Sequence, residues 1–335
     1  FFVISVQHVI LNIFDFKSGA WVYADQEVNF REEKTFDFLQ RHLESSFRSP
    51  DQKQGQFREE SRFLSILLRY KKEEMDFVAF SREIGELVHG QLNRMPLEEV
   101  LDLLVVDFKE NEVRHCGIFL LKSRPAYTHH VSTEGGGILN EIILHHAILP
   151  SISQKIESFG IVNMQSLEIG FVDKEKEMEG RTLLLLPEYI LQCSAKVSSK
   201  EAVALVKKVS SKIAEEHGKN PALVVAKAKK YISENAEFST TISPVELAAE
   251  VFGDSQEMQE EFKRGIGDGG FSSEVKIDRN YALRTGKNHK IKTDTGIELS
   301  FPAEYFENPE FIEFINNPNG TISIAIKNIG KIVNR

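Results

Sequence analysis

Two short stretches of basic side chains have the composition and spacing to bind phosphate. Residues 196–230 contain nine Lys and three Glu, and residues 276–292 contain six Lys or Arg and one Asp. Clustered Lys and Arg bind a nucleic-acid backbone because they neutralise phosphates and release counterions. Two other interpretations stay open. The first stretch could be the solvated faces of amphipathic helices, and the second an edge hairpin that lysines protect from aggregation.

The hydrophobic pattern predicts the elements that carry these basic side chains. Residues 200–217 and 221–235 predict two helices with apolar residues on one face and lysines on the other. In the second stretch, strands near 274–283 and 288–293 predict a basic hairpin around a glycine turn. The predicted nucleic-acid contacts are Lys207, Lys208, Lys212, Lys227, Lys229, Lys230, Arg279, Arg284, Lys287, Lys290 and Lys292.

The distribution of charge restricts where such contacts can form. The chain has 335 residues and a net charge of −9. Residues 1–180 hold 20 Lys or Arg and 29 Asp or Glu, whereas residues 181–335 hold 21 of each. An acidic surface repels phosphate, so we expect nucleic acid to contact only the second half of the chain.

A chain of this length predicts two domains of the α+β class. The first, residues 1–190, is expected to pack helices on a mixed or antiparallel sheet. The second, residues 191–335, is expected to combine basic helices with a small antiparallel sheet. Its closing part predicts a strand near 296–301, a helical region over 303–315 and a final strand over 321–327.

Other residue types that could do chemistry lack the required spacing. Cys116 and Cys193 are far apart, and neighbouring histidines such as His129 and His130 would point to opposite faces of a strand. The Gly-rich residues 265–270 do not follow a strand, so they predict a flexible turn rather than a nucleotide-binding loop. We therefore expect no catalytic site, no metal and no cofactor. The lack of a long apolar run and of a basic leader favours a cytoplasmic protein without a membrane partner.

Four segments carry a resemblance to a known family. They are Val9–Phe16 with Ser18-Gly19, His129-His130-Val131, Ile148–Lys155 and the closing Gly296–Ile332. In this order and spacing, the chain resembles the bacterial nucleoid-associated protein family. The resemblance implies a cytoplasmic protein of the nucleoid that binds DNA, or RNA, and it implies no enzyme activity. It supplies no site residues, so the predicted contacts depend on charge and spacing alone.

Two further interpretations concern partners. The protein could be an adaptor that reaches the nucleoid through a protein partner, with the acidic first half and the Glu-rich residues 298–313 as docking faces. A homodimer is also consistent with the sequence, because pairing two modest basic surfaces would raise avidity.

Overall fold

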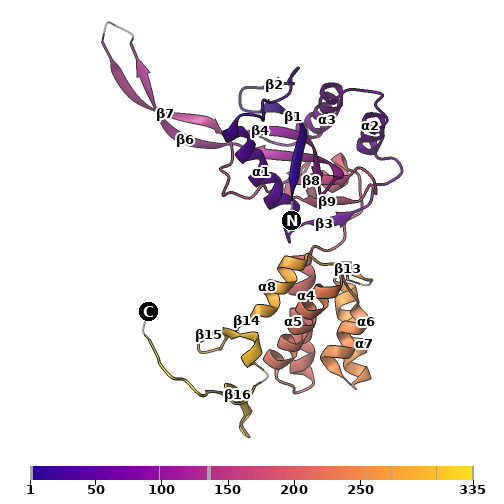
Figure 1. Cartoon of the computed structure of the whole chain (residues 1–335), viewed down its shortest axis with the longest axis vertical. Helices are drawn as coiled ribbons and strands as arrows, with labels where there is room; N and C mark the ends of the chain where they lie inside the picture. Colours follow the sequence, from indigo (N-terminus) through magenta and orange to yellow (C-terminus); the bar gives the residue numbers. More distant parts are fainter. Residues whose placement is uncertain are drawn as a thin grey trace. The chain divides into compact units, whose positions relative to one another are not determined.

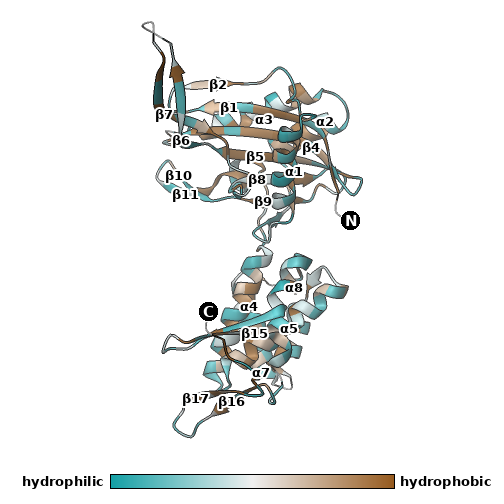
Figure 2. Ribbon diagram, turned by 60° about the vertical axis from the view of Figure 1, so that its left-hand side comes forward, coloured by the Kyte–Doolittle hydropathy of each residue, from teal (hydrophilic) through white to brown (hydrophobic). Residues whose placement is uncertain are grey.

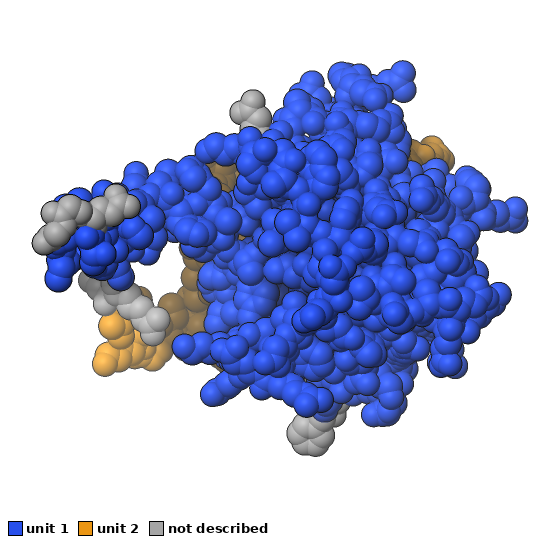
Figure 3. Space-filling view, turned by 90° about the horizontal axis from the view of Figure 1, so that it is seen from above, with its two compact units in different colours: residues 1–195 blue, residues 196–335 orange. Residues whose placement is uncertain are grey.

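The chain folds into two compact units. The computed structural model describes residues 3–97, 99–133, 137–253, 255–271, 273–306 and 308–333. Unit 1 comprises residues 1–195 and unit 2 comprises residues 196–335 (Figure 3). Each unit has helices and antiparallel strands, which confirms the α+β class.

Unit 1 is built on an antiparallel sheet of seven strands in the order β2-β1-β4-β5-β8-β9-β3. Its strands are β1 (Ile4–Asp15), β2 (Ala20–Val22), β3 (Lys53–Gly55), β4 (Val100–Glu110), β5 (Val113–Lys122), β8 (Phe159–Asn163) and β9 (Ile169–Val172). The central strand β4 has apolar side chains at consecutive positions, and both of its faces are buried. Helices must therefore cover the sheet on both sides.

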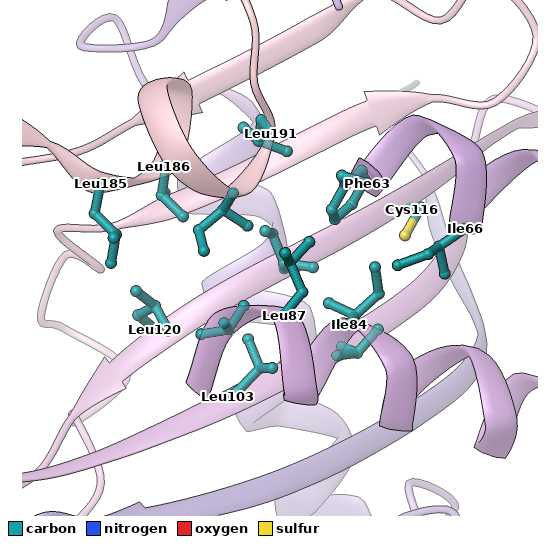
Figure 4. Packing of buried hydrophobic residues seen from close by; sticks show 14 of the residues in the cluster. Phe63, Ile66, Ile84, Leu87, Leu103, Cys116, Leu120, Leu185, Leu186 and Leu191 are labelled. Carbon is teal, nitrogen blue, oxygen red and sulfur yellow. The ribbon is translucent and has the colours of Figure 1, made fainter. Parts of the chain in front are cut away.

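Three helices provide this cover. Helix α1 (Glu33–Phe47) packs Leu39 and Leu43 against one face, in a cluster with Phe108 of β4. Helices α2 (Arg62–Lys71) and α3 (Phe77–Leu92) pack on the opposite face. In Figure 4, side chains of α2 and α3 lie over strand residues such as Leu103 and Leu120, beside the turn that carries Leu186.

A polar network crosses the α2–α3 face of the sheet. Asp107 of β4 is fully buried, and Arg114 of β5 donates to it from Nε at 2.9 Å. The Tyr70 hydroxyl of α2 donates to the same carboxylate at 2.7 Å. Burial and the Asp107 carboxylate both raise the pKa of Tyr70, while hydrogen bonding to Asp107 raises the pKa of Arg114. The buried charge is thus compensated within unit 1.

An extended hairpin projects from unit 1 (Figure 1). It consists of β6 (Arg124–Ser132) and β7 (Leu139–Ile148), which pair with each other in an antiparallel ribbon. Every residue of β7 is exposed, as are those of β6 up to Val131. We call these two strands the arm. A second small hairpin, β10 (Glu175–Met178) and β11 (Arg181–Leu184), and a π-helical turn η2 (Leu186–Ile190) complete unit 1.

In the described part of unit 2, five helices pack around an apolar cluster that includes Val206, Ile232 and Phe262. They are α4 (Ser199–Glu216), α5 (Pro221–Phe238), α6 (Pro244–Phe252), α7 (Gln256–Asp268) and α8 (Arg279–Lys287). Three antiparallel strand pairs accompany them: β12 (Thr241–Ile242) with β13 (Val275–Lys276), β14 (Asn288–Lys292) with β15 (Glu298–Pro302), and β16 (Ile312–Asn316) with β17 (Ile322–Ile326).

The expectations for two segments outside the basic stretches of unit 2 are wrong. Residues 303–315 are not a helix: a short 3-10 turn, η3 (Ala303–Tyr305), precedes strand β16. The spacing of apolar residues in this segment fits a helix as well as a strand. Antiparallel pairing with β17 makes it a strand. The Gly-rich turn expected over 265–270 lies largely inside α7, whose Gly265 and Gly269 allow close packing against Val209 and Leu205 of α4.

Candidate nucleic-acid interface

The predicted contacts of the first stretch lie on helices α4 and α5, as expected. Helix α4 begins with a capping box between Ser198 and Glu201. It buries Val206 and Ile213 in the core and exposes Lys208 and Lys212. The ammonium of Lys212 lies 3.6 Å from the carboxylate of Glu216. This exposed pair compensates the charge of Lys212 only weakly.

Helix α5 differs from the prediction at one lysine. Asn220 caps the helix and Pro221 occupies its first position. Lys227 and Lys230 are exposed, but the expectation that Lys229 lies beside them on the open face is wrong, because its side chain is buried. Helical spacing places Lys229 in line with Ala226 and Ser233, and α8 packs on this stripe.

The predicted basic hairpin over 274–293 is also wrong in its first half. Residues 279–287 form helix α8, and Asp278 caps it by accepting a hydrogen bond from the Tyr281 amide at 2.7 Å. Gly286 is not in a turn but is buried within the helix, where a Cβ would overlap that of Ser233 on α5. The glycine permits the close approach of α8 to α5. The Asp at the N-cap was a sequence signal for this helix.

The junction of α8 and β14 is tied to α5 by Lys229. Its ammonium donates to the Asn288 carbonyl at 2.7 Å and lies 3.5 Å from the ring Nδ1 of His289. Burial, with repulsion from Lys207 on α4 as a second cause, lowers the pKa of Lys229 to about 8. Burial also lowers the pKa of Lys207. Lys229 is therefore engaged inside unit 2, and we exclude it from the contact surface.

The exposed cations of the second stretch follow α8 and then β14. Arg279, Arg284 and Lys287 are exposed on α8, and Lys290 and Lys292 are exposed on β14. We call these five residues the basic strip. Residues 279–292 contain no Asp or Glu, so carboxylates can reach the strip only from other segments. One does: Glu298 of β15 lies 3.1 Å from Lys292. Figure 2 colours much of α8 as hydrophilic.

The structure thus divides the predicted contacts into three sets. The basic strip is continuous along α8 and β14, and Lys230 lies on α5 at the border of the stripe that α8 covers. Lys227, Lys208 and Lys212 lie on the solvent faces of α5 and α4. Lys207 and Lys229 meet at the junction beneath the strip. Sequence reasoning found every exposed cation of the strip but assigned most of them to the wrong kind of element.

Other chemistry has little support in the described part of the chain. It contains no cluster of three or more His, Cys, Asp or Glu that could hold a metal ion. Cys116 and Cys193 are buried; burial raises the pKa of the Cys193 thiol to about 12 and that of Cys116 further. A protonated, buried thiol is a poor nucleophile. Among the described residues, no helix is long and apolar enough to cross a membrane.

The chain has an α+β fold, and its second unit exposes a basic strip. Comparison with protein-family models places such a chain in one class, the nucleoid-associated proteins. A family model described as "Nucleoid-associated protein YejK" matches residues 13–333. The chain therefore belongs to this family, which confirms the resemblance seen in the sequence. The search of curated proteins found no match.

Proposed function

We propose that the protein binds DNA directly, without enzymatic activity, by contacting backbone phosphates with unit 2. The observation that carries this proposal is the basic strip, in which five exposed cations follow one helix and the next strand with no carboxylate between them. Family membership supports a role at the nucleoid, which we place in the cytoplasm. Contact with phosphates positions a protein on nucleic acid without selecting a sequence, and it applies to RNA as well.

The electrostatics beneath the strip favour an anionic partner. Lys229 and Lys207 repel each other, and no ion pair joins either of them to a carboxylate in the described part of unit 2. Uncompensated positive charge of this kind is stabilised when phosphates approach. Lys208, Lys212, Lys227 and Lys230 on α4 and α5 extend the same sign of charge beyond the strip.

An adaptor that docks on a protein partner has weaker support from the Glu-rich residues 298–313 than from the acidic surface of unit 1. Glu298 is paired with Lys292, and Glu313 is paired with Lys327, so both carboxylates already have a cationic neighbour. Residue 307 of the predicted docking face lies outside the described residues. The excess of carboxylates over residues 1–180 remains the feature that a basic protein partner would use.

A salt titration separates the two proposals. Fluorescence anisotropy of the full chain with two labelled 20-base-pair duplexes of unrelated sequence would be measured between 50 and 300 mM salt. Five phosphate contacts predict a slope of log affinity against log salt of about −4.5, equal for both duplexes. A single-stranded RNA of equal length tests the wider substrate class. Absence of binding at 50 mM salt would contradict direct contact and favour the adaptor.

A further inference from the structure

The arm of unit 1 exposes more apolar surface than a free hairpin in water normally does. Large apolar side chains along it are Tyr127, Val131, Leu139, Ile142, Ile143, Leu144 and Ile148, with exposures between 39% and 82%. Directly opposed residues share a face, so Tyr127, Leu144 and Ile142 form one apolar side of the ribbon. Isolated two-stranded ribbons are marginally stable in water, and contiguous exposed apolar patches mark interaction sites. The arm therefore needs a partner.

The charges of the arm argue against nucleic acid as that partner. Among the described residues of β6 and β7, Arg124 is the sole Lys or Arg and Glu141 the sole Asp or Glu. A surface without a cluster of cations cannot neutralise phosphates or anionic lipid head groups. The rest of residues 1–180 carries the negative charge of the chain, so two copies would repel each other elsewhere on unit 1. The arm is the place where they can approach.

The two edges of the arm differ in a way that selects one for pairing. Strand β6 carries Pro125 next to a register irregularity between Arg124 and Ala126. Proline and bulges are the devices by which natural edge strands avoid pairing. Strand β7 has ten residues with no Pro, Gly or Lys. Its outer edge is an open template for another strand.

We propose that the arm is a dimerisation element, in which β7 pairs antiparallel with β7 of a second copy of this chain across a two-fold axis at Ile143. In this register Ile142 lies opposite Leu144 of the other copy, and Glu141 lies opposite His145, whose ring can donate to the carboxylate. Each contact occurs twice, as a two-fold interface requires.

Disulfide trapping tests the pairing. The native Cys116 and Cys193 are buried, so an introduced cysteine is the accessible thiol. Ile143→Cys places two thiols directly opposite each other across the axis, within disulfide reach. Thr128→Cys is the matched control, because Thr128 lies opposite Ile143 within one arm but its copies would be three strand spacings apart, about 14 Å. Under a mild oxidant we expect at least tenfold more covalent dimer from Ile143→Cys. Equal yields from the two variants would overturn the proposed edge.

The oligomeric state provides a second, independent readout. Light scattering of the full chain at ~10 μM should give the mass of a dimer, and a monomer at 50 μM would overturn the proposal. Ile143→Lys sets two like charges opposite each other and should raise the dissociation constant at least tenfold, whereas Thr128→Lys should change it less than threefold. Neither variant should lower the melting temperature of unit 1, since both side chains project from the arm. A dimer unaffected by Ile143→Lys would contradict the register.

Discussion

Units 1 and 2 treat their charged groups in opposite ways. Unit 1 carries the excess of carboxylates, yet its buried Asp107 is paired with the half-buried Arg114 and accepts a hydrogen bond from Tyr70, so this charge is compensated. Unit 2 contains as many cations as carboxylates, 20 of each over residues 196–335, but it places five cations in one exposed strip. Net charge alone therefore does not locate a binding surface; the separation of charges within a unit does.

The largest effect is expected from the buried charge of unit 1. Asp107→Asn leaves Arg114 without its carboxylate and should destabilise unit 1 by about 3 kcal/mol. Asp25→Asn is the matched control, because Asp25 is paired with Arg82 at the surface and is 84% exposed, where such pairs contribute little. Hydrogen exchange followed by mass spectrometry reports each unit separately. Equal losses in both variants would show that burial does not distinguish the two pairs.

A smaller effect is expected where α8 meets α5 in unit 2. Gly286→Val places a side chain where a Cβ would already overlap that of Ser233 on α5. The substitution should lower the free energy of unfolding of unit 2 by about 2 kcal/mol. It should also weaken DNA binding about tenfold, since α8 carries three residues of the basic strip. Gly90→Val on α3 has open space around it and serves as control. If Gly286→Val is destabilised but keeps its DNA affinity, DNA binding by the basic strip does not depend on the packing of α8 against α5.

The two units should also respond oppositely to pH. In unit 1, burial raises the pKa of Asp102 to about 6 from 3.8, and its Oδ1 accepts no hydrogen bond from the described residues. The folded state therefore holds a proton that the unfolded state releases, so the stability of unit 1 should fall as pH rises from about 4 to 6. Asp102→Asn should abolish this fall, seen by thermal unfolding across the range. The exposed Asp37→Asn should retain it.

In unit 2 the sign is reversed. The pKa of Lys229 is lowered to about 8 from 10.5, so the unfolded state binds the proton more tightly. The stability of unit 2 should therefore rise as pH increases from about 8 to 10.5. Lys229→Met should remove the rise, whereas Lys227→Met on the open face of α5 should keep it. A rise that persists in Lys229→Met would assign the effect to another group.

Local signals in the sequence predicted much of unit 2. The 3.6-residue pattern predicted α4 and α5, and the structure places their N-caps at Ser198 and Asn220. Helix α8 was missed because Gly286 looked like a turn, while its role is to admit Ser233 of α5, a contact 53 residues away in the chain. The burial of Lys229 was missed for the same reason. The periodicity of α5 shows which of its residues share a face, but not which helix packs on that face. The face of α5 that α8 covers was therefore predicted to be exposed to solvent.

The sheet of unit 1 shows the complementary case. Consecutive apolar residues in β4 predicted a strand, and the structure adds that both of its faces are covered by helices. The strand order could not be read from the pattern, because β1 pairs with β4 across the three intervening helices. Nor does the sequence of β6 and β7 show that these strands leave the sheet. Pairing partners far apart in sequence decide both features.

The most direct test of the account compares charge reversal in the two units. One variant carries Arg279→Glu, Arg284→Glu, Lys287→Glu and Lys290→Glu in the basic strip; the other carries Arg31→Glu, Lys34→Glu, Lys71→Glu and Lys72→Glu on exposed positions of unit 1. Both change the net charge equally. For duplex DNA at 100 mM salt, we predict a loss of about 100-fold or more for the strip variant, with a salt slope reduced by about 3–4. The unit 1 variant should stay within threefold of the unmodified chain. Equal losses would mean that total charge, and not the strip, governs binding.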